Sequence, residues 1–153
     1  MDGSRKGRKA DMSETSLTKT FEFSASHRYW IPDWSEEENM RVFGKCAYPN
    51  GHGHNYLLEV TVKGPVDRVT GMVMNLVDIK SVVEGVLAEF DHKHLNKDME
   101  YFKKRIPTTE NLAITLWDLI GKGLPEEARL SRVRLHEDED LYVEHFGGRD
   151  AAV

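Results

Sequence analysis

Two histidines separated by a single residue, His52 and His54, carry the strongest chemical signal in this sequence. Residues i and i+2 of a β-strand point to the same side and lie about 6.5–7 Å apart, so two imidazoles placed there can bind one ion. His27 fits as a third ligand, because it ends an apolar alternation where an unpaired imidazole would be costly. A catalytic zinc ion takes three protein ligands and keeps one position open. The pattern therefore predicts a zinc site, with Zn²⁺ as the cofactor.

Cys46, six residues before His52, can be interpreted in three ways. A structural zinc site usually has four ligands, and this thiol could be the fourth. A thiol close to a bound cation has a lowered pKa and can act as a base or a nucleophile. A single buried cysteine is also often inert. The residues alone leave these interpretations open, and with them the choice between an enzyme and a non-enzymatic zinc domain.

Three acidic positions and one further histidine are also candidates for chemistry. Asp91 and His92 follow an expected helix, where a carboxylate and an imidazole can move protons near neutral pH or can simply be polar residues at a helix end. Glu137 lies on the apolar face of an expected strand, where a carboxylate needs partners such as the N–H groups of a ligand, unless the strand ends there and the group is solvated. Glu110 has a simpler explanation, because acids are favoured in the first turn of a helix.

The hydrophobic pattern predicts the elements that must position these side chains. Long strands are expected at residues 21–27, 52–63, 130–137 and 141–146, with a short returning strand at 72–75. Helices with one apolar face are expected at residues 76–90 and 109–120, the second capped by Thr108 or Thr109. Residues 28–50 and 91–107 are expected to be connections, the first with one short helix. The order strand, strand, helix, helix, strand, strand indicates the α+β class.

The overall composition limits the possible functions. A chain of 153 residues is long enough for one domain, which we place at residues 18–148 after a disordered tail at residues 1–17. The net charge of −5 disfavours a general nucleic-acid partner, although a local basic pocket for an anionic substrate remains compatible with it. No stretch approaches the ~20 apolar residues of a membrane helix. With a single cysteine and no secretory signal, we expect a cytoplasmic protein.

Taken together, these residues resemble the 6-pyruvoyl-tetrahydropterin synthase family. The resemblance extends from about residue 18 to about residue 146 and depends on a combination of short motifs rather than on any one of them. The matching motifs are FSASHR at residues 23–28, GKC at 44–46, PNGHGHNY at 49–56, TGMVMN at 70–75, DHK at 91–93, TTEN at 108–111 and the strand-end residue Glu137.

The resemblance implies a tunnelling fold, in which two helices pack on one face of a four-stranded antiparallel sheet. It implies a homohexamer made of two trimers stacked head to head, with active sites between subunits. It also implies a lyase of tetrahydrobiopterin biosynthesis, which converts 7,8-dihydroneopterin triphosphate to 6-pyruvoyl-tetrahydropterin and releases triphosphate. The spacing C-x5-H-x-H resembles the pyruvoyl-forming branch, and a related enzyme, 6-carboxy-tetrahydropterin synthase of deazapurine (queuosine) biosynthesis, is the alternative.

The resemblance also implies a role for each candidate residue. The zinc ligands are His27, His52 and His54; the proton-abstracting base is Cys46, with Asp91 and His92 as its relay partners; the pterin ring is held by Glu137, with help from Thr109 and Glu110.

Overall fold

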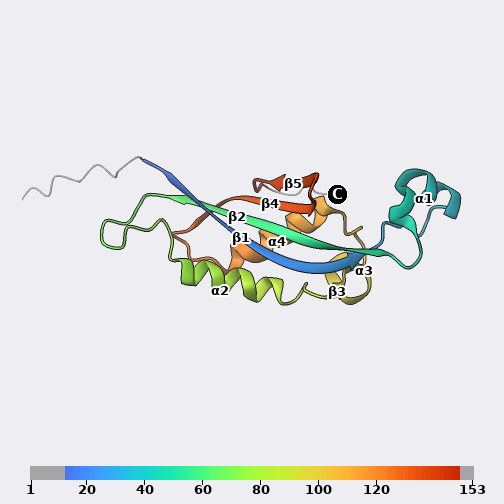
Figure 1. The fold of residues 1–153 in the computed structure, drawn as a ribbon, viewed down its shortest axis with the longest axis horizontal. Helices are drawn as coiled ribbons and strands as arrows, with labels where there is room; N and C mark the ends of the chain where they lie inside the picture. Colours follow the sequence, from blue (N-terminus) through green and yellow to red (C-terminus); the bar gives the residue numbers. More distant parts are fainter. Residues whose placement is uncertain (1–12, 149–153) are drawn as a thin grey trace, which may run out of the picture.

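Strands β1 (Thr15–His27) and β2 (His52–Gly64) pair antiparallel along their whole length in the computed structural model, which describes residues 13–148. The remaining strands are β3 (Lys93–His94), β4 (Arg129–Asp138) and β5 (Leu141–His145). The α-helices are α1 (Glu36–Phe43), α2 (Leu76–Leu87), α3 (Leu95–Asp98) and α4 (Thr109–Gly123), and the 3₁₀ helices are η1 (Gly44–Ala47) and η2 (Glu100–Phe102). The sheet has the order β3-β1-β2-β4-β5, so β2 lies inside it, whereas β1 is covered on its outer side only by the two residues of β3 (Figure 1).

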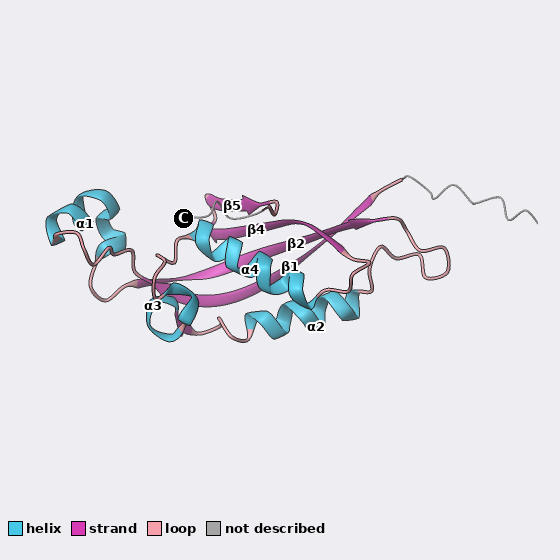
Figure 2. Ribbon diagram, turned by 180° about the vertical axis from the view of Figure 1, so that it is seen from behind, coloured by secondary structure: helices cyan, strands magenta, loops and turns pink. Residues whose placement is uncertain are grey.

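Alternation along the strands separates an apolar face of the sheet from a polar one. Side chains such as Phe23 and Leu58 are buried against α2 and α4, which lie on the same side of the sheet (Figure 2). Both helices begin at side-chain caps, and the cap of α4 is one of the two expected. The side chain of Asn75 accepts a hydrogen bond from the backbone of the second residue of α2, and the side chain of Thr108 accepts one within the first turn of α4. The predicted α+β class, with two main helices on one face, is confirmed.

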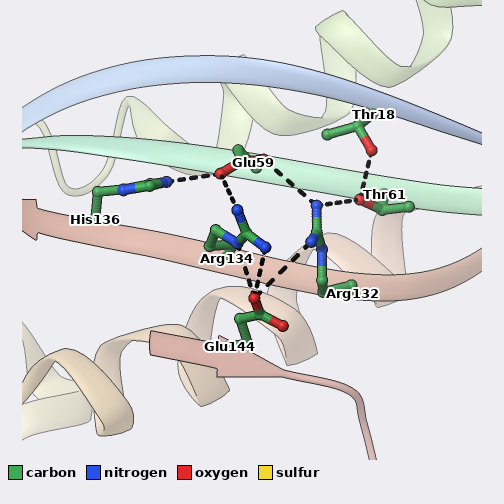
Figure 3. A network of polar contacts seen from close by, with 7 residues as sticks. All are labelled: Thr18, Glu59, Thr61, Arg132, Arg134, His136 and Glu144. Carbon is green, nitrogen blue, oxygen red and sulfur yellow. Dashed lines mark hydrogen bonds and ion pairs between the residues drawn. The ribbon is translucent and has the colours of Figure 1, made fainter. Parts of the chain in front are cut away.

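The helix-free face of the sheet carries a network of charged side chains (Figure 3). Glu59 of β2 lies 2.6 Å from Nε2 of His136 and 3.5 Å from Arg134, both on β4. Arg134 reaches Glu144 of β5 at 2.7 Å, and Arg132 approaches Glu59 at 3.4 Å. Opposite charges on neighbouring strands stabilise their pairing, which explains why this polar face does not disturb the sheet.

The prediction of a four-stranded, fully antiparallel sheet is wrong in detail. The fifth strand, β3, has two residues and runs parallel to β1, with Ser26 opposite His94. A strand this short shows no alternation that a sequence pattern could reveal. The returning strand expected at residues 72–75 is also absent from the described structure. It has no place in the sheet, because β2 is already paired with β1 on one edge and β4 on the other.

The connections contain more regular structure than expected. Residues 28–50 include α1 and η1, and residues 91–107 include β3, α3 and η2. The first strand begins at Thr15, so the end of the predicted disordered tail is ordered, whereas residues 1–12 of that tail lie outside the described residues. Within the described part of the chain, no helix combines the length and apolar character that crossing a membrane requires.

Candidate active site

The register of β1 and β2 brings the three predicted zinc-binding histidines together. His27, the last residue of β1, is paired with His52, the first residue of β2, and His54 follows two residues later. The Nε2 atoms of His27 and His52 are 3.1 Å apart. The centroids of the three imidazole rings lie 4.6, 4.9 and 5.1 Å from one another. Two neighbouring strands thus direct three potential nitrogen ligands toward one point.

A backbone carbonyl determines which nitrogen of His27 is available to a cation. Nδ1 lies 2.8 Å from the carbonyl oxygen of Pro107, which can only accept, so Nδ1 must carry the proton and donate. Burial lowers the pKa of His27 to about 4, so the imidazole is neutral near neutral pH. Nε2 then presents a bare lone pair toward His52. Metal-binding histidines are typically held in this way, with the other ring nitrogen donating to a carbonyl or a carboxylate.

Glu137 of β4 joins the three histidines as a fourth potential donor. Its Oε1 atom lies 3.2 Å from Nε2 of His54, and that buried nitrogen has no hydrogen-bond partner among the described residues. One donor atom each from His27, His52, His54 and Glu137 lies within 4.8 Å of the other three. A buried carboxylate and inward-facing imidazole nitrogens suit a divalent cation, because the cation satisfies lone pairs that otherwise face one another. The donor set therefore fits a metal ion.

The carboxylate of Glu137 is held from its other side by α4. The hydroxyl of Thr109, itself buried, donates to Oε2 of Glu137, so the structure brings these two predicted substrate-binding residues together. Glu110, the next residue, is exposed in the first turn of α4, where its charge suits the start of a helix. Its role in substrate binding stays a prediction.

Cys46 lies in η1, where the negative charge of Glu137 acts on its thiol. The backbone carbonyl of Cys46 accepts a hydrogen bond of 2.8 Å from the backbone N–H of Tyr29. Burial, followed by the negative charge of Glu137, raises the pKa of the thiol. Among the described residues, the cluster of metal-donor atoms includes Glu137 and not Cys46. This arrangement favours an interpretation in which the thiol lies beside the cluster rather than closing it.

Asp91 and His92 are placed together, and His92 lines the same pocket as His54 of the cluster. Oδ2 of Asp91 lies 3.0 Å from Nδ1 of His92, and Oδ1 accepts a hydrogen bond of 2.9 Å from the backbone of Ser24 in β1. The side chain of His92 is 81% exposed. No contact within the described chain joins either side chain to Cys46 or to the histidine cluster. The relay to Cys46 therefore stays a prediction.

Two residues close to the metal-donor cluster were not predicted. The hydroxyl of Tyr56 lies 3.3 Å from Nδ1 of His27, and burial raises the pKa of this tyrosine. A signal for it existed, because Tyr56 continues the alternation of His52 and His54. Pro107 gave no such signal, since it contributes only its carbonyl and lies 80 residues from His27 in sequence.

Gly51 controls how β2 approaches β1 at the cluster. Its φ of +68° favours glycine, and a Cβ atom added there would lie 2.8 Å from the carbonyl oxygen of His27. We expect Gly51→Ala to displace the start of β2 and to weaken metal binding by about tenfold or more. Calorimetric titration with Zn²⁺ measures this effect.

Gly71→Ala is the matched control. Gly71 has a similar φ of +72°, but nothing lies within 4 Å of the added Cβ. It should lose about 1–2 kcal/mol of unfolding free energy through backbone strain, yet bind metal normally. Equal metal affinities in the two variants would contradict this explanation of Gly51.

The fold and the cluster define a class of protein: an α+β domain in which strand ends on one sheet hold donor atoms suited to a metal ion. Comparisons with known proteins identify the family within this class. The family model for 6-pyruvoyl tetrahydropterin synthase matches residues 16–147. The chain therefore belongs to the 6-pyruvoyl tetrahydropterin synthase family of enzymes.

Individual relatives agree with this assignment. The chain is 48% identical to 6-pyruvoyl tetrahydrobiopterin synthase of Poecilia reticulata, in a match covering 86% of this chain and 89% of the relative. It is 44% identical to the protein of the same name from Homo sapiens, covering 88% and 92% respectively. The solved structure of 6-pyruvoyl tetrahydropterin synthase from Caenorhabditis elegans superposes with a TM-score of 0.86 at 35% identity, covering 90% of this chain and 98% of that one.

Proposed function

We propose that this chain is a zinc-dependent lyase that converts 7,8-dihydroneopterin triphosphate to 6-pyruvoyl-tetrahydropterin and releases triphosphate. It would serve tetrahydrobiopterin biosynthesis in the cytoplasm. The observation that carries the proposal is the convergence of three imidazoles beside the buried carboxylate of Glu137. Relatives named 6-pyruvoyl tetrahydrobiopterin synthase support the choice of reaction.

The metal would be held by His27, His52 and His54. Bound there, zinc supplies Lewis-acid chemistry, which polarises the hydroxyl groups of a substrate side chain and stabilises the charge left when a carbon-bound proton departs. The chain contributes the orientation of the ligands: Pro107 holds His27, and Asp138 lies 3.3 Å from Nδ1 of His54.

Cys46 is proposed as the base that takes the carbon-bound proton. The charge of Glu137 acts on its thiol, and Cys46 is not among the metal donors of the described chain, which supports a role other than metal binding. Because burial and the charge of Glu137 raise the pKa of the thiol, the active thiolate requires positive charge nearby. A divalent cation at the cluster meets this requirement.

Glu137 is proposed to anchor the pterin ring. Thr109 occupies Oε2, which fixes the carboxylate and leaves Oε1 facing the cluster. A carboxylate in this position can accept hydrogen bonds from the amino and ring N–H groups of a pterin. Glu110 is proposed to assist from the start of α4.

A homohexamer, as the family resemblance implies, would explain the position of Asp91 and His92. Both lie at the edge of β1, exposed, and make no contact with Cys46 in their own chain. We propose that they face the Cys46 of a neighbouring copy and return a proton there. The sites would then lie between subunits.

Subunit complementation tests this arrangement. Cys46→Ala and His92→Ala should each be nearly inactive alone, whereas hexamers assembled from equal amounts of both should recover about a quarter of the wild-type rate, because a quarter of the shared sites receive both intact residues. The rate of triphosphate release after subunit exchange is the measurement. Mixed hexamers as inactive as their parents would show that the two residues serve the same chain or different steps.

The reaction itself is tested by incubating the zinc-loaded protein with dihydroneopterin triphosphate and analysing the products by mass spectrometry. We expect triphosphate and 6-pyruvoyl-tetrahydropterin. Acetaldehyde with a 6-carboxy product would instead indicate the carboxy-forming relative. An intact, zinc-loaded protein that releases no triphosphate would contradict the proposed function.

A further inference from the structure

A groove of about 550 Å³ with a strongly basic lining lies between the segment that follows β1 and the segment that connects β3 to α4. We call it the basic groove. Its charged lining residues are the cations Arg28, Lys97, Lys103, Lys104 and Arg105 and a single acid, Asp33. In a chain with a net charge of −5, this local excess of positive charge is distinctive. The positive side chains repel one another, and an anion bound in the groove would offset this repulsion.

Four cations of the basic groove have no carboxylate partner in the part of the chain that the structure describes. Among residues 13–148, no carboxylate forms an ion pair with Arg28, Lys97, Lys103 or Lys104. Arg28 is held in place instead: its Nε donates to the carbonyl of Ala47 at 2.8 Å, and its guanidinium stacks 3.9 Å from the ring centroid of Trp30. An arginine fixed in this way has little side-chain freedom to lose when its remaining N–H groups bind an anion.

The basic groove is lined by two segments that are connected along the chain to the surroundings of His27. On one wall, Arg28 directly follows His27. On the other wall, Ile106 directly precedes Pro107, whose carbonyl accepts the hydrogen bond from His27. Within the cluster, Glu137, the proposed pterin anchor, lies next to His54. The groove is therefore connected along the chain to His27, and not to the histidine that Glu137 contacts.

From this juxtaposition we infer that the basic groove binds the triphosphate chain of the substrate, an inference that rests on the proposed function. A substrate whose ring is held at Glu137 and whose hydroxyl-bearing side chain passes the cluster extends its terminal phosphates toward Arg28. Arg28 supplies a forked donor near the cluster, and the lysines supply flexible charges further out. The open groove also gives the released triphosphate a path to solvent.

Binding of inorganic triphosphate is the direct test, because it does not depend on turnover. We expect the Lys97→Glu/Lys104→Glu double variant to bind triphosphate at least about tenfold more weakly than wild type in calorimetric titration. Lys80→Glu/Lys122→Glu is the matched control: it changes the net charge equally, on exposed positions of α2 and α4 outside the groove lining, and should bind like wild type. Equal weakening in both double variants would overturn the inference.

Two further experiments distinguish triphosphate binding in the groove from triphosphate binding to the metal and from an effect of misfolding. Triphosphate can also bind zinc, so the titration is repeated on the metal-free His52→Ala protein. This variant should still bind triphosphate in the groove. Loss of all binding would show that the anion binds the metal, and would overturn the inference. Lys104→Gln, a milder change, should show a smaller weakening in the same direction, and an unchanged affinity would count against the groove.

The kinetic arm uses the substrate itself. In the groove double variant, KM for dihydroneopterin triphosphate should rise about tenfold with a smaller change in kcat, while binding of dihydroneopterin without phosphates stays unchanged. If the protein binds triphosphate through the groove but releases none from the substrate, the proposed function fails and the groove stands. If turnover is normal and the groove variant has an unchanged KM, the groove fails and the function stands.

Discussion

Replacing Cys46 with alanine is expected to slow triphosphate release by about 10²–10⁴-fold, the usual contribution of a positioned acid or base, and to leave the zinc content unchanged. The expectation follows because Cys46 is not among the metal donors of the described chain, although the charge of Glu137 acts on its thiol. Steady-state kinetics and metal analysis on the same preparation measure both quantities.

The Cys46→Ser variant shows whether the slower reaction of Cys46→Ala comes from loss of the base or from loss of side-chain volume. Serine keeps a similar volume but has a far higher pKa, so this variant should be nearly as slow as Cys46→Ala. A serine variant with close to wild-type activity would show that the thiol does not act as the base. Loss of zinc from either variant would instead support the closed-site interpretation, in which Cys46 is a metal ligand.

Replacing His52 with alanine is expected to weaken zinc binding by more than about 100-fold and to abolish turnover, because it removes one of the three nitrogen ligands. His52 is chosen because it is only partly buried, whereas His27 is fully buried and its removal would leave a cavity. Metal affinity is measured by competition with a chelator of known affinity, and circular dichroism checks that the sheet is intact.

His145→Ala provides the matched control for His52→Ala. His145 ends β5 and packs against Trp117, with ring centroids 5.3 Å apart, and it is not among the metal donors of the described chain. This variant should bind zinc as wild type does. A His52→Ala protein that binds zinc as tightly as the control would contradict the assignment of the metal ligands.

Local sequence patterns predicted the metal-donor side chains, because each of them lies on the buried face of a strand. The H-x-H spacing required His52 and His54 to share a face, and the apolar alternation of β1 required His27 to point the same way. Only the pairing register was needed to bring them together, and the structure has His27 opposite His52. Glu137 was predicted by the same reasoning, because it shares the buried face of β4 with Val133 and Leu135.

Features built from distant segments could not be predicted in this way. The carbonyl that orients His27 belongs to Pro107, and no side-chain pattern marks a backbone carbonyl. The basic groove combines two connections whose cations are unremarkable in sequence, and only the fold brings Arg28 close to residues 97–105. The short strand β3, which directly follows the exposed His92, likewise carries no periodic signal.

X-ray absorption at the zinc edge of the zinc-loaded protein tests the ligand assignment most directly. We predict a first shell of nitrogen and oxygen atoms at about 2.0–2.2 Å, with the multiple scattering of imidazole rings and no sulfur. A sulfur atom at about 2.3 Å in the resting enzyme, or a protein that takes up no zinc at all, would contradict a three-histidine centre with a position open to substrate.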